Sequence, residues 1–214
     1  MSPRAAAALV RPAALAVGVA HARGVAHRDV KPANLFLTTA KGTDTLKVLD
    51  FGIAKVLTAN EAVTRALRET GVGFSAFTPQ YGDPEQFSRR FGATGPWTDV
   101  FALGLVFIEL VSGKPALDGV DGAQLFAASS DERFRPSLHA AGVTGFPEID
   151  AVLARALAVD PGARYSTASQ LWAALEAVST ADALPLAATL PAIAVSDPPP
   201  LRLTTTTGPG AMTG

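Results

Sequence analysis

A run of twelve residues, Val100 to Val111, is almost wholly apolar and constrains the fold more than any other segment. Glu109 is its one charged residue, and Asp99 stands immediately before it. Such a run is too short to cross the hydrocarbon core of a bilayer, which takes about 20 residues. An apolar helix of this length instead needs other elements on every side. The run therefore predicts a buried central helix, expected over Thr98 to Ser112.

Weaker patterns place the other elements around that helix. Helical patterns follow it at Gly122 to Ser129, Glu148 to Ala158 and Ser166 to Ser179. Before it, the β-like runs "NLFLT" and "TLKVLDF" are joined by "TAKGTD", which predicts a hairpin. Residues 50–96 show little periodicity and are expected to form a long loop, which inside a compact domain is usually functional. The predicted fold class is α+β and mostly α, in one domain over residues 1–180.

The two ends of the sequence need separate interpretation. Residues 1–24 combine an early Arg, apolar runs and an Ala-His-Ala that resembles a signal-peptide cleavage site. Because Arg11 and Pro12 interrupt the run, we favour a helix with Pro12 in its first turn, which continues to Ala22 and ends at Gly24. Residues 181–214 contain "SDPPP", "TTTT" and "GPG", and are expected to form a disordered Pro/Thr-rich tail.

Composition excludes several classes of function. The net charge of −1 gives no basic footprint for nucleic acid. The chain has no cysteine, which excludes disulfides and thiolate metal sites and fits a reducing compartment, so we expect a cytoplasmic location. Three histidines without HExxH-like spacing argue against a zinc site. We also expect no membrane segment in this chain.

The stretch "HRDVKPANLF" gathers the polar groups that phosphoryl transfer needs. Asp29 can accept a proton from a hydroxyl nucleophile, and Lys31 can neutralise a phosphoryl group. Asn34 offers a neutral oxygen to a hard cation such as Mg²⁺. The second β-like run ends in "DFG", where Asp50 is an anionic Mg²⁺ ligand on a turn that Gly52 makes flexible. If the two runs pair, both metal ligands lie at the same end of the hairpin, which is half of a phosphoryl-transfer site.

Each of these residues also has a simpler interpretation when it is taken alone. Asp29 could cap a turn, and Lys31 could be a solvated surface charge. Asp50 could begin a turn at the end of a strand. A histidine in the position of His27 is more often a packed, hydrogen-bonded ring than a catalyst. The order of the whole set argues against coincidence.

With its motifs in this order, the sequence resembles the C-terminal lobe of a eukaryotic-like bacterial serine/threonine protein kinase, over roughly residues 11–180. "HRD" matches the catalytic loop and "DFG" the metal-binding turn. "FTPQYGDPEQF" resembles the substrate-binding loop, with Asp-Pro-Glu in place of Ala-Pro-Glu, "WTDVFALG" the start of the central helix and "DPGARYS" a late loop. The matched residues are His27, Arg28, Asp29, Lys31, Asn34, Asp50, Phe51, Gly52, Thr78, Glu85, Asp99 and Arg164.

The resemblance implies a role for each catalytic position. Asp29 would be the base, and ATP with Mg²⁺ the cofactors, with Asn34 and Asp50 holding the metal ion. Lys31 would contact the transferred phosphoryl group and marks serine/threonine specificity. The Thr78 hydroxyl would bridge Asp29 and Lys31, although it could also be an ordinary turn threonine. The substrates would be serine and threonine hydroxyls of proteins.

Other matched residues would have structural or regulatory roles. The resemblance implies an ion pair between Glu85 and Arg164, and hydrogen bonds from the backbone around the HRD triplet to Asp99. Arg28 suggests that phosphate on the following loop organises the site, since arginine binds phosphate through two hydrogen bonds. The candidate phosphate carriers are Thr64, Thr70 and Ser75, near Arg65 and Arg68.

The departures from the family concern the ATP-binding N-lobe. No acidic residue precedes Asp29, the first lysine is Lys31, and "GVGFSA" is not a complete glycine-rich loop. We therefore expect the N-lobe to be missing, the isolated chain to be impaired, and self-association or a partner that carries an N-lobe. A non-catalytic kinase-like binding module or a gene remnant stays open. A small-molecule phosphotransferase of the aminoglycoside-kinase type also stays open, although Lys31, the "TPQY…DPE" loop and Asp99 argue against it.

Overall fold

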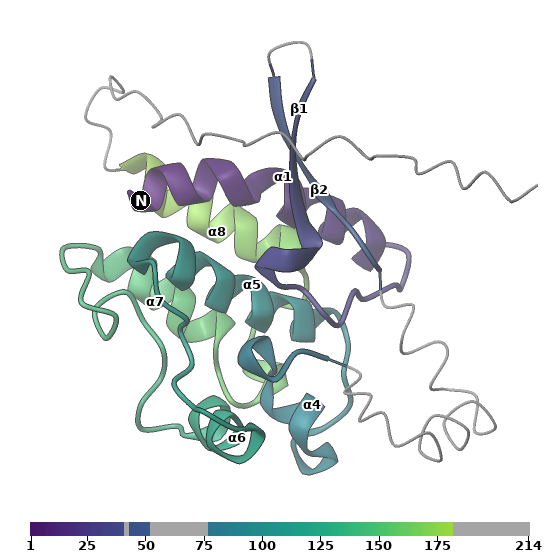
Figure 1. The fold of residues 1–214 in the computed structure, drawn as a ribbon, viewed down its shortest axis with the longest axis vertical. Helices are drawn as coiled ribbons and strands as arrows, with labels where there is room; N and C mark the ends of the chain where they lie inside the picture. Colours follow the sequence, from purple (N-terminus) through teal and green to yellow (C-terminus); the bar gives the residue numbers. More distant parts are fainter. Residues whose placement is uncertain (41–42, 52–76, 182–214) are drawn as a thin grey trace, which may run out of the picture. The chain divides into compact units, whose positions relative to one another are not determined.

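The structure is a computed structural model that describes residues 1–40, 43–51 and 77–181. In this part of the chain, helices surround a central helix, and one antiparallel hairpin projects from the bundle (Figure 1). This arrangement confirms the predicted α+β, mostly α fold class. The tail predicted for residues 181–214 lies outside the described residues from 182 onward, so it stays a prediction.

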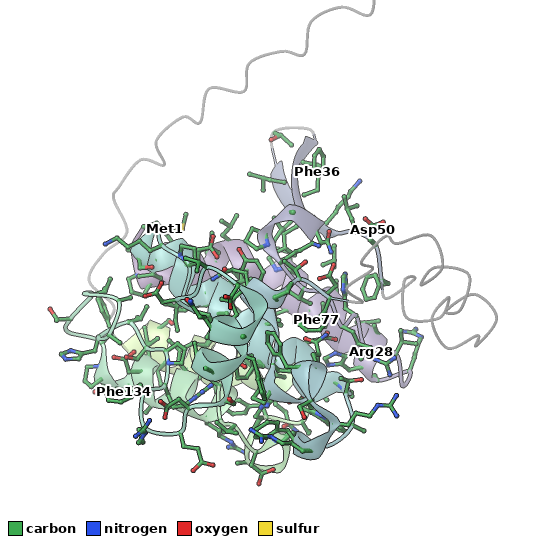
Figure 2. The ribbon with its side chains drawn as sticks, turned by 60° about the horizontal axis from the view of Figure 1, so that its bottom comes forward. Met1, Arg28, Phe36, Asp50, Phe77 and Phe134 are labelled. Carbon is green, nitrogen blue, oxygen red and sulfur yellow. The ribbon has the colours of Figure 1, made fainter. Side chains whose placement is uncertain are left out.

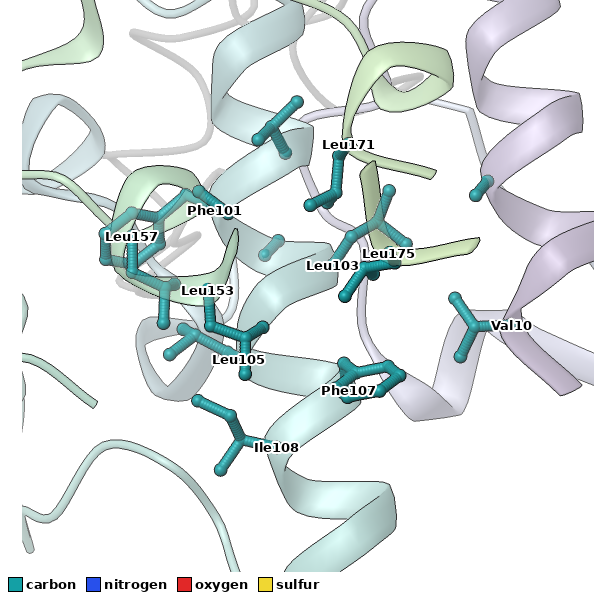
Figure 3. Packing of buried hydrophobic residues seen from close by; sticks show 14 of the residues in the cluster. Val10, Phe101, Leu103, Leu105, Phe107, Ile108, Leu153, Leu157, Leu171 and Leu175 are labelled. Carbon is teal, nitrogen blue, oxygen red and sulfur yellow. The ribbon is translucent and has the colours of Figure 1, made fainter. Parts of the chain in front are cut away.

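The apolar run forms the central helix α5, Pro96–Ser112, as predicted. Pro96 occupies its first turn, and Gly113 ends it in the left-handed conformation with φ 75°, which glycine adopts without steric penalty. Phe101 and Phe107 are completely buried in a core cluster that includes leucines of neighbouring helices (Figure 3). Burying each such side chain stabilises the fold by roughly 1.5–3 kcal/mol. The site is therefore built on a helix that is largely buried.

Helix α1, Pro3–His21, begins nine residues before the predicted start at Pro12, so that part of the prediction is wrong. The Ser2 hydroxyl caps the helix by accepting a hydrogen bond from Ala5 N–H at 3.2 Å, and Pro3 takes the first turn. Pro12 instead lies inside the helix, where proline costs about 3 kcal/mol. Packing offsets this cost, because one face of the helix is buried. The buried residues are Pro3, Ala6, Ala7, Val10, Ala13, Ala14, Val17, Gly18 and His21.

The last helix, α8 (Ala168–Ala181), lies along α1 (Figure 1). The two approach closely at Gly18, where an added Cβ would come within 2.0 Å of the Ser169 hydroxyl. By length and composition, α1 is also the one helix in the described ranges that could cross a membrane, and 44% of its apolar window is buried inside the fold. Gly24, with φ 74°, follows the end of α1, as predicted.

Strands β1 (Leu35–Ala40) and β2 (Thr43–Val48) form the predicted hairpin. Their antiparallel register runs from Leu35 opposite Val48 to Ala40 opposite Thr43. One further bond, from Leu49 N–H to the Asn34 carbonyl at 2.9 Å, extends the pairing beyond the strands. The short 3₁₀ helix η1, Pro32–Asn34, leads into β1. Both predicted metal ligands therefore lie at the open end of the hairpin: Asn34 immediately precedes β1, and Asp50 follows β2.

The segment predicted as a long loop over residues 50–96 contains regular structure in its described part. It includes the 3₁₀ helices η2 (Pro79–Tyr81) and η3 (Arg89–Phe91) and the short helix α4 (Pro84–Phe87). These turns are too short to show helical periodicity, which explains why the pattern looked irregular. The remaining elements match the predicted helices with ends shifted by one or two residues. They are α6 (Gly122–Ser130), α7 (Pro147–Ala156) and α8, with the 3₁₀ helix η4 (Pro161–Ala163) before α8.

Candidate active site

Three polar side chains from two distant segments meet at the predicted base. Lys31 Nζ lies 2.8 Å from Asp29 Oδ2 and donates to Thr78 Oγ1 at 2.7 Å. Asp29 Oδ1 accepts from both the backbone N–H of Thr78 at 3.0 Å and its hydroxyl at 2.9 Å. The side chains of Asp29 and Lys31 are 27% and 23% exposed, so solvent and a substrate can reach them. The arrangement therefore holds both oxygens of the Asp29 carboxylate, Oδ1 through Thr78 and Oδ2 through Lys31, in a partly exposed position.

Asn34 holds the same loop from the other side. Its amide nitrogen donates to the Asp29 carbonyl at 2.8 Å and to Asp29 Oδ2 at 3.2 Å. Both bonds use the nitrogen, so the amide oxygen remains available to a cation. The η1 turn provides this geometry, because Asn34 N–H donates to the Lys31 carbonyl at 3.0 Å.

Asp50 lies one residue beyond the backbone bond that joins Leu49 to Asn34, at the same end of the hairpin. It is exposed, and its φ of 55° places it in the left-handed region, which costs a residue other than glycine roughly 1–3 kcal/mol. Within the described ranges, no three acidic or histidine side chains form a metal cluster. An Asn–Asp pair fits Mg²⁺, which binds through one or two protein ligands together with phosphate oxygens and water. Gly52, the other residue of this turn, lies outside the described residues.

A single buried carboxylate fixes the backbone that carries the base. Asp99, with a fully buried side chain, accepts from His27 N–H at 2.7 Å and from Arg28 N–H at 2.6 Å. These bonds hold Arg28 at φ 67°, again in the left-handed region. Asp99 stands in the first turn of α5, where the helix dipole favours a negative charge. The central helix thereby sets the conformation of the catalytic loop.

His21 is a functional position that sequence reasoning missed. Its Nε2 lies 2.8 Å from Asp99 Oδ2, and its Nδ1 accepts from the backbone N–H of Ala168 at 3.1 Å. Because a backbone N–H can only donate, Nδ1 carries no proton, and the Nε2 proton is donated to Asp99. His21 therefore joins α1 to the start of α8 and orients Asp99. A histidine near the end of an alanine-rich helix gives no pattern that would predict this contact.

His27 links the catalytic loop to the hairpin. Its Nε2 lies 2.8 Å from the Leu49 carbonyl, and its Nδ1 accepts from Asp29 N–H at 3.3 Å. The ring also packs against Phe51, with ring centroids 4.8 Å apart. The side chain is fully buried, so its contacts are all made within the fold.

A second polar cluster is formed by Asp83, Glu85 and Arg164. Arg164 donates to both Glu85 oxygens at 2.9 Å and to Asp83 Oδ2 at 3.3 Å, and all three side chains are fully buried. It also donates to the carbonyls of Ala158, Val159 and Trp97. Every donor of the guanidinium is thus directed at an acceptor, and the cluster joins α4 to the loop before α8.

Asp83 gives this cluster one more carboxyl group than its arginine can neutralise. Burial raises the pKa of Asp83 well above its ordinary value, and a hydrogen bond to Glu85 and that residue's negative charge raise it further. The ion-pair geometry alone would favour an ionised Asp83, but Arg164 makes its two shorter bonds to Glu85. We therefore assign the arginine's charge to Glu85 and a retained proton to Asp83. Asp83 also caps α4 by accepting from Gln86 N–H at 3.0 Å.

The backbone of Arg28 is fixed by hydrogen bonds, but its side chain is not fully hydrogen-bonded. Its side-chain Nε is buried and has no hydrogen-bond partner among the described residues, while its carbonyl accepts from Gln86 Nε2 at 2.7 Å. Figure 2 shows it on the same side of the molecule as Phe77 and Asp50. The candidate phosphate carriers Thr64, Thr70 and Ser75 lie outside the described residues, so the regulatory hypothesis stays a prediction.

The η2 turn connects this site to the far end of α5. The Tyr81 hydroxyl donates to Glu109 Oε2 at 2.8 Å, and burial together with this bond raises the pKa of the phenol. Gln80 Nε2 donates to the Leu117 carbonyl in the loop after α5. The segment that begins with Thr78 is therefore tied by Tyr81 to the central helix and by Gln80 to the loop that follows it.

The sequence of this chain is similar to those of known protein kinases. The family model described as the protein kinase domain matches residues 1–174. The serine/threonine-protein kinase PknB of Mycobacterium leprae is 34% identical over 176 residues, which are 82% of this chain and 26% of that protein. The probable serine/threonine-protein kinase CE0033 of Corynebacterium efficiens is 36% identical over 83% of this chain and 26% of its own length. The chain thus spans about a quarter of the length of these relatives.

Solved structures give the same picture of the fold. The kinase domain of PknI from Mycobacterium tuberculosis superposes with a TM-score of 0.57 and 26% identity, covering 83% of this chain and 56% of that domain. PK-1, the kinase of Cydia pomonella granulovirus, superposes with a TM-score of 0.55 and 22% identity over 79% of this chain and 57% of its own. The second likeness supports the fold alone.

Proposed function

Because the chain belongs to the protein kinase family, we propose that its site transfers the γ-phosphate of ATP to serine and threonine hydroxyls of protein substrates. The observation that carries this proposal is the contact among Asp29, Lys31 and Thr78. It joins a base, a cation and a hydroxyl from segments 47 to 49 residues apart, at a place that solvent reaches. A site of this kind needs positioned charges more than covalent chemistry.

Each residue of the site has a separate role in the proposed transfer. Asp29 accepts the proton of the substrate hydroxyl at its carboxylate. Lys31, now paired with Asp29 Oδ2, neutralises charge on the moving phosphoryl group. ATP supplies the phosphoryl group, and Mg²⁺ supplies charge compensation when it is bound. Asn34 and Asp50 would hold the metal ion, through the free amide oxygen and the exposed carboxylate.

Thr78 would exchange its hydrogen bonds when a substrate arrives. Its hydroxyl already occupies a position beside Asp29 Oδ1 and Lys31 Nζ, at 2.9 and 2.7 Å. A substrate serine or threonine presents the same chemical group to the same pair. The Thr78 hydroxyl thus makes the contacts that a substrate hydroxyl would make, which supports a hydroxyl-bearing substrate.

We also propose that residues 1–214 transfer phosphate poorly without further protein around the nucleotide. Apolar side chains at the hairpin end of the site stay in contact with solvent: Phe36 is 57% exposed, Leu37 43% and Leu49 42%. Exposed apolar surface next to a site favours a covering partner, either an N-lobe-bearing segment or a second copy of this chain. Water at this place would also screen the charges that a closed site concentrates.

The proposal also covers the membrane, the cellular location and nucleic acid. We propose that α1 is a core helix and not a membrane anchor, because one of its faces packs against α5 and α8. A cytoplasmic location and the lack of a nucleic-acid partner rest on the cysteine-free, nearly neutral composition.

The test is phosphotransfer with the purified chain. We expect the 214-residue protein with Mg²⁺ and ATP to label a serine peptide well below the ~1–100 s⁻¹ of typical kinases. A version extended upstream, if its coding DNA contains a glycine-rich loop and a VAIK-like lysine, should reach that range. Turnover in this range by residues 1–214 alone would contradict the predicted impairment. Failure of both versions to transfer phosphate would instead favour a non-catalytic binding module.

A further inference from the structure

A groove of about 570 Å³ opens at the far end of the central helix, outside the site described above. Its walls are the loop that follows α5 and the loop around Pro136, and its floor includes Ile108. The volume lies within the range of about 300–1,000 Å³ that is typical of ligand-binding pockets. The described contacts of the phosphotransfer site do not use it.

Small side chains create the space in this groove. Ala116, Gly119, Ala140 and Ala141 all line it, so short side chains leave room that larger ones would fill. Its floor is apolar, because Ile108 is buried. Its rim is polar and carries Lys114, Asp118 and Ser137. This combination suits an apolar side chain on an otherwise hydrated peptide.

The groove is continuous with the phosphotransfer site through the η2 turn. Gln80 lines the groove and donates to the Leu117 carbonyl, two residues after Thr78 contacts Asp29. The residue between Gln80 and Gly82 is Tyr81, which lines the small space beside Asp29. The groove therefore begins one short turn along the chain from the residue that contacts Asp29.

Exposed apolar side chains extend the surface beside it. Val120, the neighbour of Gly119, is 90% exposed, and Phe134, two residues before Pro136, is 75% exposed (Figure 2). These are the two most exposed large apolar residues in the described part of the chain. Exposed apolar side chains that flank a groove in the sequence are consistent with a surface that binds other proteins.

We propose that this groove binds an apolar side chain of the protein substrate, at a distance along the substrate from the serine or threonine that is phosphorylated. This inference rests on the proposed function and names a second contact for the same substrate. The contact holds the substrate before and after transfer, so it affects how tightly the substrate binds and not the chemical step. Specificity then depends on the distance between the apolar residue and the hydroxyl.

The test uses fluorescently labelled peptides and the 214-residue chain. Each peptide carries one serine and one phenylalanine in a Gly/Ala/Lys background, with the phenylalanine moved one position at a time. We expect peptides of one spacing to bind at least about 10-fold more tightly than the matched Phe→Ala peptides, a difference of about 1.4 kcal/mol. Binding is measured by fluorescence anisotropy, so it needs no catalytic turnover.

A filling substitution locates the contact. Ala140→Trp, at an exposed groove position, should abolish the effect of the phenylalanine. Ala154→Trp, at an exposed position of α7 outside the groove, should leave it intact. A phenylalanine effect that survives Ala140→Trp, or the lack of any such effect, would overturn the proposal. Self-association of the chain that Ala140→Trp abolishes, without peptide binding, would overturn it in favour of a contact between two copies.

Phosphotransfer separates this inference from the proposed function. The extended kinase is assayed with the serine peptide that lacks phenylalanine. Labelling of that peptide without any phenylalanine effect would refute the groove alone. Phenylalanine-dependent binding without labelling of any peptide would refute the proposed catalytic function.

Discussion

Two polar clusters in this protein are built from the same kinds of groups but differ in burial. Arg164, Glu85 and Asp83 have fully buried side chains, while Lys31 and Asp29 are 23% and 27% exposed. The buried cluster directs every guanidinium donor at an acceptor within the fold. The exposed cluster satisfies its groups with Thr78, a hydroxyl that a substrate can replace.

The difference in burial suggests that the first cluster stabilises the fold and the second takes part in phosphotransfer. A buried charge without its partner is costly, so the first cluster tolerates no exchange of partners. A pair near the surface loses less when a partner leaves, because water takes its place. We therefore expect substitutions in the buried cluster to act on the free energy of unfolding, and those in the exposed cluster to act on turnover.

The largest effect is expected from Asp29→Asn in the extended, active kinase. Turnover should fall by about 10²–10⁴-fold, because the variant lacks the base but keeps the shape of the side chain. The asparagine oxygen can still accept from Thr78, so the unfolding midpoint in urea should stay unchanged. Steady-state phosphorylation and urea titration measure the two quantities. Full turnover in Asp29→Asn would refute the assignment of the base.

The next effect is expected from Arg164→Met. It leaves two carboxyl groups buried without a cation and should lower the free energy of unfolding by about 3–5 kcal/mol. Urea denaturation followed by circular dichroism measures the loss. The triple variant with Asp83→Ala and Glu85→Leu removes those groups and should be more stable than Arg164→Met alone. Equal stability of the two variants would show that unpaired charge is not the cause.

Arg133→Met provides the matched control for this effect. Arg133 pairs with Asp131 at 3.1 Å, but its side chain is 81% exposed. Since solvent screens the pair, no measurable change in stability is expected. A loss as large as that of Arg164→Met would remove the distinction between the clusters.

A smaller effect should appear as a dependence on pH. The folded-state pKa of Asp83 is raised above its ordinary value of 3.8, mainly by burial. Its contribution to stability is therefore complete below about pH 4 and is lost as pH rises towards the folded pKa, by up to about 1.4 kcal/mol per pH unit. Relative to Asp83→Asn, which cannot ionise, the wild-type protein should lose stability as the pH rises above about 4. Parallel stability curves for the two proteins would contradict the retained proton.

The smallest measurable loss is expected from Tyr81→Phe, at a partly buried residue. It removes one hydrogen bond, to Glu109 at 2.8 Å, and should cost about 0.5–1.5 kcal/mol. Thermal denaturation is sensitive enough to detect this change. If the loss equals that of Arg164→Met, the half-buried bond belongs with the buried cluster.

Sequence patterns predicted the elements whose signals are local. The central helix followed from twelve apolar residues, and the hairpin from two β-like runs around a turn. The catalytic residues could be proposed because their motifs stand in a fixed order, and the structure brings Asp29, Lys31 and Thr78 together. Glu85 and Arg164, paired in the structure, came from the family resemblance and not from any local pattern.

What sequence patterns missed depends on contacts between distant segments. His21 meets Asp99 and Ala168, and nothing near it in the sequence points to either. Pro12 was taken as the start of a helix, because the packing that offsets its cost comes from other helices. Asp83 was read as a departure from a motif, and only its burial beside Glu85 explains its chemistry.

The hydrogen bonds of His21 also have a consequence for folding during synthesis of the chain. Its bond to Ala168 spans 147 residues, and its bond to Asp99 spans 78. A ribosome adds about 5–20 residues each second, so roughly 7–30 seconds pass between the synthesis of the two ends of the longer bond. During that interval His27 and Arg28 have already emerged, but the contacts that fix their backbone are incomplete. The catalytic loop is therefore synthesised well before the segments that hold it, and its backbone can be fixed only after they have followed.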